Sequence, residues 1–193
     1  MKKNKKIILI CEMALFVAIG IVLDLLQGLI GSFWPSGGSI GIAIIATLIF
    51  SYRHGLYGLV CGLITGLLTM LNGIYISPFA TNSFHIFLQL GLDYFLSWMV
   101  VGFAGLFARK VATSKYRIYF VIGSSILGGF LKFICHFLSG MIYWPSEDTT
   151  SQFIYSLTYN GSYMLPTIII STIIMVLIAY KAPIIIKNDK YSN

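Results

Sequence analysis

Six apolar segments constrain the fold of this chain more than any other feature of its sequence. They run approximately over residues 7–30, 39–52, 55–71, 84–108, 118–143 and 154–180. A helix needs roughly 20 predominantly apolar residues to cross the hydrocarbon core of a bilayer. The second segment is short for a span, so we expect it to be steep or extended by flanking Gly and Ser residues. The sequence therefore predicts an all-α membrane protein with six transmembrane helices, in which residues 1–193 form one domain.

The composition excludes an ordinary water-soluble protein. Hydrophobic residues make up 58% of the chain and charged residues only 10%, whereas soluble domains contain about 45–50% apolar and about 25% charged residues. Polar side chains are too few to cover the surface, so most of that surface must face lipid. No polar stretch is long enough to form a separate soluble catalytic domain.

The positions of the basic residues predict the orientation of the helices. The formal net charge is +7, but the basic residues stand in short clusters between apolar segments, not on one water-exposed face as nucleic-acid binding requires. With segments that cross alternately, 12 of the 13 basic residues fall on one side: Lys2, Lys3, Lys5, Lys6, Arg53, Arg109, Lys110, Lys115, Arg117, Lys181, Lys187 and Lys190. The positive-inside rule assigns that side to the cytoplasm. Both termini are therefore expected in the cytoplasm.

Polar side chains inside the later apolar segments predict a pocket. The fourth segment carries one at every fourth residue: His85, Gln89, Asp93 and Ser97. The fifth segment carries the remaining basic residue, Lys132, and His136 one turn later, while the sixth begins with Tyr155, Tyr159, Asn160 and Tyr163. An ionisable group in mid-bilayer costs at least ~2.5–3.5 kcal/mol, so it needs a partner or a function. We expect the three polar stripes to face one another near the non-cytoplasmic end.

Two interpretations of these residues stay open at this point. Asp93 and Lys132 could form a structural ion pair that holds two helices together, and Trp34, Tyr75 and Trp144 could be interfacial anchors. Alternatively, the aromatic side chains form the walls of a pocket around the carboxylate, which would suit a flat, cationic, heteroaromatic ligand. The Gly/Pro/Ser-rich loop at 31–38 is then either a lid over that pocket or a plain interfacial turn.

Sequence motifs for catalysis and metal binding are missing. Cys11, Cys61 and Cys135 lie in apolar segments at unrelated spacings and predict neither a disulfide framework nor a zinc site. The chain has no P-loop, no H-E-x-x-H and no G-x-S-x-G motif. We therefore expect no metal, no cofactor and no enzymatic activity, and any uphill transport would draw its energy from a partner or an ion gradient.

Small residues at intervals of four indicate close helix packing. Gly58, Gly62 and Gly66 form such a row in the third segment, and Ala14 and Ala18 form a similar strip in the first. Residues of this size allow helix backbones to approach closely in lipid. The glycine row is expected to lie inside the bundle.

The combined pattern resembles the thiamine-specific substrate-binding subunits (S-components, ThiT or YuaJ type) of energy-coupling factor (ECF) transporters. The resemblance covers essentially the whole chain, and its most specific parts are the spacing Lys-x3-His-x7-Trp followed by Tyr-x4-Asn. The matching stretches are Leu90-Gly-Leu-Asp-Tyr94, Gly102-Phe-Ala-Gly-Leu-Phe107, Leu131-Lys-Phe-Ile-Cys-His-Phe-Leu-Ser-Gly140 with Tyr143-Trp144, and Tyr155-Ser-Leu-Thr-Tyr-Asn-Gly161.

The resemblance implies a non-enzymatic, multi-pass protein of a bacterial, Gram-positive-like cell membrane, with a thiamine pocket near its outer face. Carried over by position, the substrate-binding residues would be Trp34, Tyr75, Asp93, Tyr94, Lys132, His136, Trp144, Tyr155 and Asn160. Ala14 and Ala18 would dock against a transmembrane coupling subunit that two cytoplasmic ATPases drive. Asp93 would balance the thiazolium charge and could pair with Lys132 when the site is empty.

One position departs from the family pattern, since Asp93 stands where the family usually has Glu. One methylene fewer withdraws the carboxylate by ~1.5 Å, so the backbone compensates, a water intervenes, or the ligand differs from thiamine. The alternatives are an S-component for a thiamine precursor or related vitamin, a solitary ion-coupled carrier, and an intramembrane enzyme that uses Asp93, Lys132 and His136 as acid–base groups.

Overall fold

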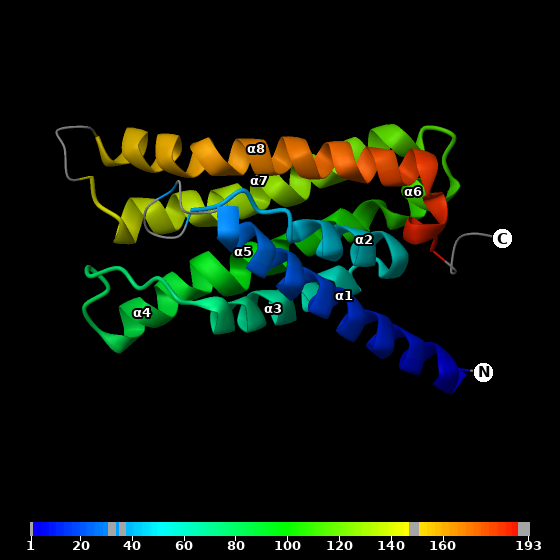
Figure 1. The fold of residues 1–193 in the computed structure, drawn as a ribbon, viewed down its shortest axis with the longest axis horizontal. Coiled ribbons are helices and arrows are strands. Elements are labelled where there is room, and N and C mark those ends of the chain that lie inside the picture. The colour runs from blue at the N-terminus through cyan, green and yellow to red at the C-terminus, as the bar shows by residue number, and fades with distance from the viewer. Residues whose placement is uncertain (1, 31–33, 35–37, 147–150, 189–193) are drawn as a thin grey trace.

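The computed structural model describes residues 2–30, 34, 38–146 and 151–188, which form a helical bundle (Figure 1). The first three helices are α1 (Lys2–Ile30), α2 (Ile44–His54) and α3 (Tyr57–Thr69), and a short 3₁₀ turn, η3 (Met70–Asn72), extends α3. A long fourth helical segment runs from 83 to 113. The last two long helices are α7 (Arg117–Tyr143) and α8 (Gln152–Lys181), followed by η6 (Pro183–Ile186). The predicted six-helix architecture is confirmed.

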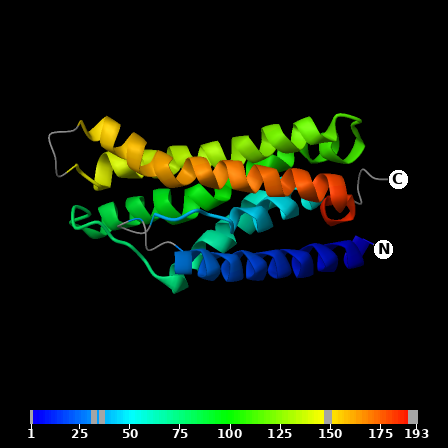
Figure 2. The same cartoon turned by 45° about the horizontal axis from the view of Figure 1, so that its top comes forward.

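The helices lie roughly along one axis, with α7 and α8 side by side over their length (Figure 1). On the other side of the bundle, α1 packs on α2 and α3 and lies apart from α7 and α8 in Figure 2. Within the described residues, four helices are long and apolar enough to cross a membrane: Lys5–Gly28, Ser83–Thr113, Arg117–Tyr143 and Gln152–Lys181. Helix α6 and the first and last described residues lie at the same end, as an even number of crossings requires (Figure 1).

Helix α2 differs from the expected range 39–52 because its first residues are not helical. The Gly41 amide donates to Thr167 Oγ1 at 2.7 Å, and the Ala43 amide donates to Gln27 Oε1 at 3.2 Å. Side chains of α8 and α1 thus satisfy backbone donors that a helix would otherwise bond internally. Residues 44–52 are all buried by neighbouring helices, so this short segment does not have to span the lipid alone.

The fourth helical segment changes its winding several times. It consists of α4 (Ser83–Leu90), a π-helical stretch η4 (Gly91–Leu96), α5 (Ser97–Met99), a 3₁₀ stretch η5 (Val100–Phe107) and α6 (Ala108–Thr113). π-Helical turns inside α-helices are rare, and those that occur frequently lie at functional sites. This one carries Asp93 and Tyr94.

The predicted glycine row brings α3 against the π-helical stretch and the short helix α5 that follows it. A Cβ atom added to Gly62 would lie 2.2 Å from the Trp98 carbonyl oxygen, and one added to Gly66 would lie 2.2 Å from that of Tyr94. No side chain fits at such distances, so the two backbones touch directly. The close packing expected from the glycine spacing is confirmed, and it fixes the backbone that follows Asp93.

A charged cluster fastens α1 to α2 near the end that holds the termini. The Glu12 carboxylate accepts hydrogen bonds from Arg53 Nε and Nη2, each at 2.6 Å, and lies 2.8 Å from His54 Nε2. The sequence assigned no role to Glu12. In the structure it links the two helices through their side chains.

Candidate ligand-binding pocket

A cavity of about 150 Å³ lies between the helices, toward the end opposite the start of α1 and the end of α8. Its walls come from the end of α1, the non-helical residues 38–41, the π-helical stretch, the second half of α7 and the first half of α8. A cavity needs roughly 10–15 Å³ of such volume to hold a single water molecule. The cavity is therefore large enough for a small organic molecule or a cluster of waters.

Asp93 reaches this cavity from the π-helical stretch. Its Oδ1 lies 3.5 Å from His136 Nδ1 of α7, and its Oδ2 accepts a hydrogen bond from Gln89 Nε2 at 3.3 Å. The side chain is 16% exposed. The carboxylate is thus held by α4 and α7 while one side remains open to the cavity.

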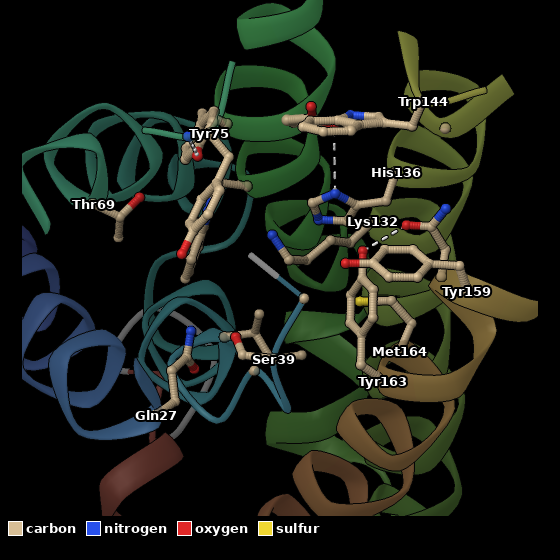
Figure 3. A pocket seen from close by; sticks show the side chains of 18 of the residues that line it. Gln27, Ser39, Thr69, Tyr75, Lys132, His136, Trp144, Tyr159, Tyr163 and Met164 are labelled. Atoms are coloured by element: carbon tan, nitrogen blue, oxygen red, sulfur yellow. Dashed lines mark hydrogen bonds and ion pairs between the residues drawn. The ribbon is translucent and has the colours of Figure 1, made fainter. Parts of the chain in front are cut away.

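Lys132 points into the cavity from the middle of α7 (Figure 3). Its Nζ lies 3.5 Å from Ser97 Oγ and 4.2 Å from the centre of the Trp98 ring. Within the described residues it makes no ion pair at 4.0 Å or less. The predicted pairing of Lys132 with Asp93 is therefore not seen, since the aspartate contacts His136 instead.

Aromatic side chains form much of the cavity wall. The rings of Tyr155 and Tyr159 are stacked, with centres 6.1 Å apart, and the Tyr163 ring meets the His136 imidazole edge-on at 6.0 Å. In Figure 3, Tyr75 lies across the cavity from Tyr159 and Tyr163, and the Trp144 ring lies above His136. Flat faces on opposite sides of one space suit a flat ligand.

Two glutamines hold the cavity wall in place. The buried Gln89 accepts a hydrogen bond from the Ser77 amide at 3.0 Å and donates to the Tyr75 carbonyl at 2.9 Å, which ties the segment before α4 to that helix. Gln152 Nε2 donates to the carbonyl oxygen of Trp144 at 2.8 Å, where α7 ends. Each of these side-chain amides thus donates a hydrogen bond to the backbone carbonyl of an aromatic residue that lines the cavity.

The structure brings together most of the predicted binding residues. Those that line the cavity are Tyr75, Asp93, Tyr94, Lys132, His136, Trp144, Tyr155 and Asn160. Trp34 is not among the lining residues; it lies against Gly38 and its indole N–H donates to Ser162 Oγ at 2.8 Å. The rest of the proposed lid, residues 31–33 and 35–37, lies outside the described residues.

Several lining residues were not predicted. They include Asp24, Gln27, Ser39, Thr69, Trp98 and Met164, whereas Tyr159 and Tyr163 belong to the polar stripe of the sixth segment that was expected to face the pocket. Asp24 is a carboxylate inside an apolar segment, so the rule that singled out Asp93 also applied to it. Trp98 lies one residue after a polar stripe residue, and no sequence signal distinguished it from a packing residue.

Comparison with known proteins identifies the family. A sequence model described as "Thiamine transporter protein (Thia_YuaJ)" matches residues 10–187. The chain belongs to the thiamine transporter family. "Thiamine transporter ThiT" of Bacillus subtilis is 36% identical over 98% of this chain and all of that protein, and its namesake from Lacticaseibacillus paracasei is 24% identical over 98% and 96%. The solved structure of ThiT from Listeria monocytogenes matches with a TM-score of 0.81, at 26% identity, over 95% of this chain and 100% of that one.

Family membership confirms the predicted class of protein. Members of the thiamine transporter family are transport proteins and not enzymes, so the acid–base alternative for Asp93, Lys132 and His136 is dropped. The relatives come from Gram-positive bacteria, and four helices in the part of the chain that the structure describes are long and apolar enough to span a membrane. The protein is a multi-pass membrane protein that serves thiamine uptake.

Proposed function

We propose that the cavity between α1, α7, α8 and the π-helical stretch is the thiamine site of a substrate-binding subunit. The observation that carries this proposal is the arrangement of Asp93 beside His136, among aromatic faces, in one enclosed space. Thiamine consists of a cationic thiazolium ring and an aminopyrimidine ring. Its charge requires a carboxylate, and its two flat rings require stacking partners.

Each group in the cavity matches one feature of this ligand. Asp93 balances the thiazolium charge, which a desolvated carboxylate does more strongly than one in water. Trp144 and the tyrosines provide π faces that attract a cationic ring. Lys132 provides a hydrogen-bond donor, and Asn160, whose amide oxygen already accepts from Tyr163 at 2.6 Å, helps to fix the orientation of the bound ring.

The shorter carboxylate of Asp93 is accommodated by the backbone in this proposal. The π-helical turn surrounds Asp93, and the backbone contact of Gly66 with Tyr94 holds that turn in place. The wider turn presents the carboxylate to the cavity although Asp is one methylene shorter than Glu. A thiamine precursor or a related vitamin remains the alternative ligand, and competition with the separate pyrimidine and thiazole halves distinguishes the two.

A titration of the purified protein tests the assignment. Trp98 and Trp144 line the cavity, so thiamine binding is expected to change tryptophan fluorescence with saturation at micromolar ligand or below. Replacing Asp93 by Ala should weaken binding by about ten-fold or more, a loss of about 1.4 kcal/mol. The control is Thr158→Ala, because that hydroxyl lies on the exposed side of α8. A flat titration, or an Asp93→Ala protein that binds like wild type, refutes the proposed site.

The coupling to energy is part of the same proposal. The chain has no ATP-binding motif and needs no cofactor of its own, so ATP would be used by two partner ATPases through a transmembrane coupling subunit. Ala14 and Ala18 are exposed on α1 and would form the docking strip. Both termini would lie in the cytoplasm, which places the cavity toward the outer face, where it can collect the vitamin.

A further inference from the structure

Asp24 gives the cavity a second carboxylate from an unexpected direction. It stands near the end of α1, on the side opposite α7 and α8, and it lines the same cavity as Asp93 and Lys132. The Asp24 residue is half-buried. The alternative is a purely structural role, in which the Asp24 carboxylate only ties α1 to its neighbours.

The hydrogen bonds of Asp24 leave its charge without a counter-ion. Oδ1 accepts from Gln27 Nε2 at 2.7 Å and Oδ2 accepts from Asn72 Nδ2 at 2.8 Å. Both donors are neutral amides, and in the part of the chain that the structure describes no cationic side chain lies within 4.0 Å of Asp24. A carboxylate has about four acceptor positions, so a ligand can still bond to it.

The charges around the cavity do not cancel. Among the described residues, its acidic and basic lining side chains are Asp24, Asp93, Lys132 and His136. With neutral His136, two carboxylates face one ammonium, and the net charge is −1. One ammonium offsets one carboxylate, which leaves one negative charge for a monovalent cation.

We propose that Asp24 is a ligand-binding carboxylate that makes the cavity selective for a molecule with one fixed positive charge. The inference rests on the proposed thiamine site and adds a specificity-determining residue to it. Lys132 offsets one of the two carboxylates, and the ligand offsets the other. An uncharged molecule of the same shape leaves a desolvated charge unpaired, which is costly in a low-dielectric site.

The test compares two ligands on the purified full-length protein. The first is thiamine, and the second is its uncharged isostere in which a thiophene ring replaces the thiazolium. Asp24→Asn keeps the size and polarity of the side chain and removes the charge. It should weaken thiamine binding by about ten-fold or more, while binding of the isostere is not weakened, because the unpaired charge that this ligand would leave is removed. Asp24→Glu keeps the charge and should retain most of the preference for the cation.

Two further variants separate charge from structure. Asn72→Lys places an ammonium beside Asp24 at an exposed position and should lower the cation preference as Asp24→Asn does, even if the latter folds poorly. Glu12→Gln removes the other carboxylate of α1, outside the cavity, and should leave the ratio of the two affinities unchanged. An equal loss for both ligands in Asp24→Asn and Asn72→Lys, or no loss for either, overturns the inference. Absence of thiamine binding by the wild-type protein would instead refute the site itself.

Discussion

Gln89 connects three parts of the pocket through one side chain. The amide is completely buried and contacts the Ser77 amide, the Tyr75 carbonyl and the Asp93 carboxylate. Buried polar groups are costly when they lose their partners. The residue is therefore expected to matter for the shape of the site, although its role in ligand contact is indirect.

Replacing Gln89 by Leu tests this role. The change leaves the Ser77 amide and the Tyr75 carbonyl without their partner, so we expect a loss of about 1–3 kcal/mol in the free energy of unfolding. Thiamine affinity should fall as well, because Tyr75 and Asp93 both lose a support. Thermal unfolding and the fluorescence titration measure the two effects. Phe87→Leu, on the exposed side of the same helix, is the control; equal behaviour of the two variants would contradict the prediction.

At the level of single residues, the cost of charge in lipid predicted much of the cavity. Asp93, Lys132 and His136 were expected to converge, and they do line one cavity. The partner of the Asp93 carboxylate was not predictable. Whether Asp93 meets Lys132 or His136 depends on side-chain directions that sequence spacing does not define. The place of Trp34 was also beyond the sequence, since a loop has no periodicity that orients its side chains.

Among the elements, α3 depends most directly on the π-helical stretch and on α5, which follows it. The Gly62 and Gly66 positions touch the carbonyl oxygens of Trp98 and Tyr94. The spacing of the glycines at every fourth residue predicted that this face of α3 packs closely against another helix, but not which helix. The π-helical winding itself was not predicted, because periodic patterns describe the faces of a helix and not a local change in its hydrogen bonds.

Gly62→Ala is expected to disturb this contact. The added methyl group would force the two backbones apart, and overpacking of this kind costs roughly 1–3 kcal/mol. We expect a lower melting temperature and weaker thiamine binding, because the backbone beside Asp93 moves with Trp98. Gly123→Ala on α7 is the matched control, since nothing lies within 4 Å of its added methyl group. A Gly62→Ala protein as stable as the Gly123→Ala protein would show that the contact is not tight.

For the whole molecule, the six apolar segments were sufficient to predict the architecture, and α2 shows where such a prediction stops. The segment is apolar because protein surrounds it, whereas α1 is apolar because lipid does. Composition cannot distinguish the two environments. The non-helical residues 38–43 likewise depend on Thr167 and Gln27, which are distant in sequence.

The proposed docking strip gives a prediction at this scale. Ala14→Leu combined with Ala18→Leu enlarges the exposed small-residue face of α1 without touching the cavity. When the protein is co-expressed with an ECF coupling subunit and its two ATPases, we expect the variant to lose co-purification and vitamin uptake and to keep its thiamine affinity. Leu177→Trp, on the exposed face of α8, serves as the control and should assemble normally. Normal assembly of the double variant would place the interface elsewhere.

The position of α1 at the edge of the bundle has a mechanical consequence. Its outer side faces lipid, whereas Asp24 and Gln27 on its inner side line the cavity. A slide of this helix by a single residue is about 1.5 Å, half the reach of a hydrogen bond, and would already separate these groups from their partners. In the proposed complex, a coupling subunit that binds the outer side of α1 would therefore move one wall of the cavity directly.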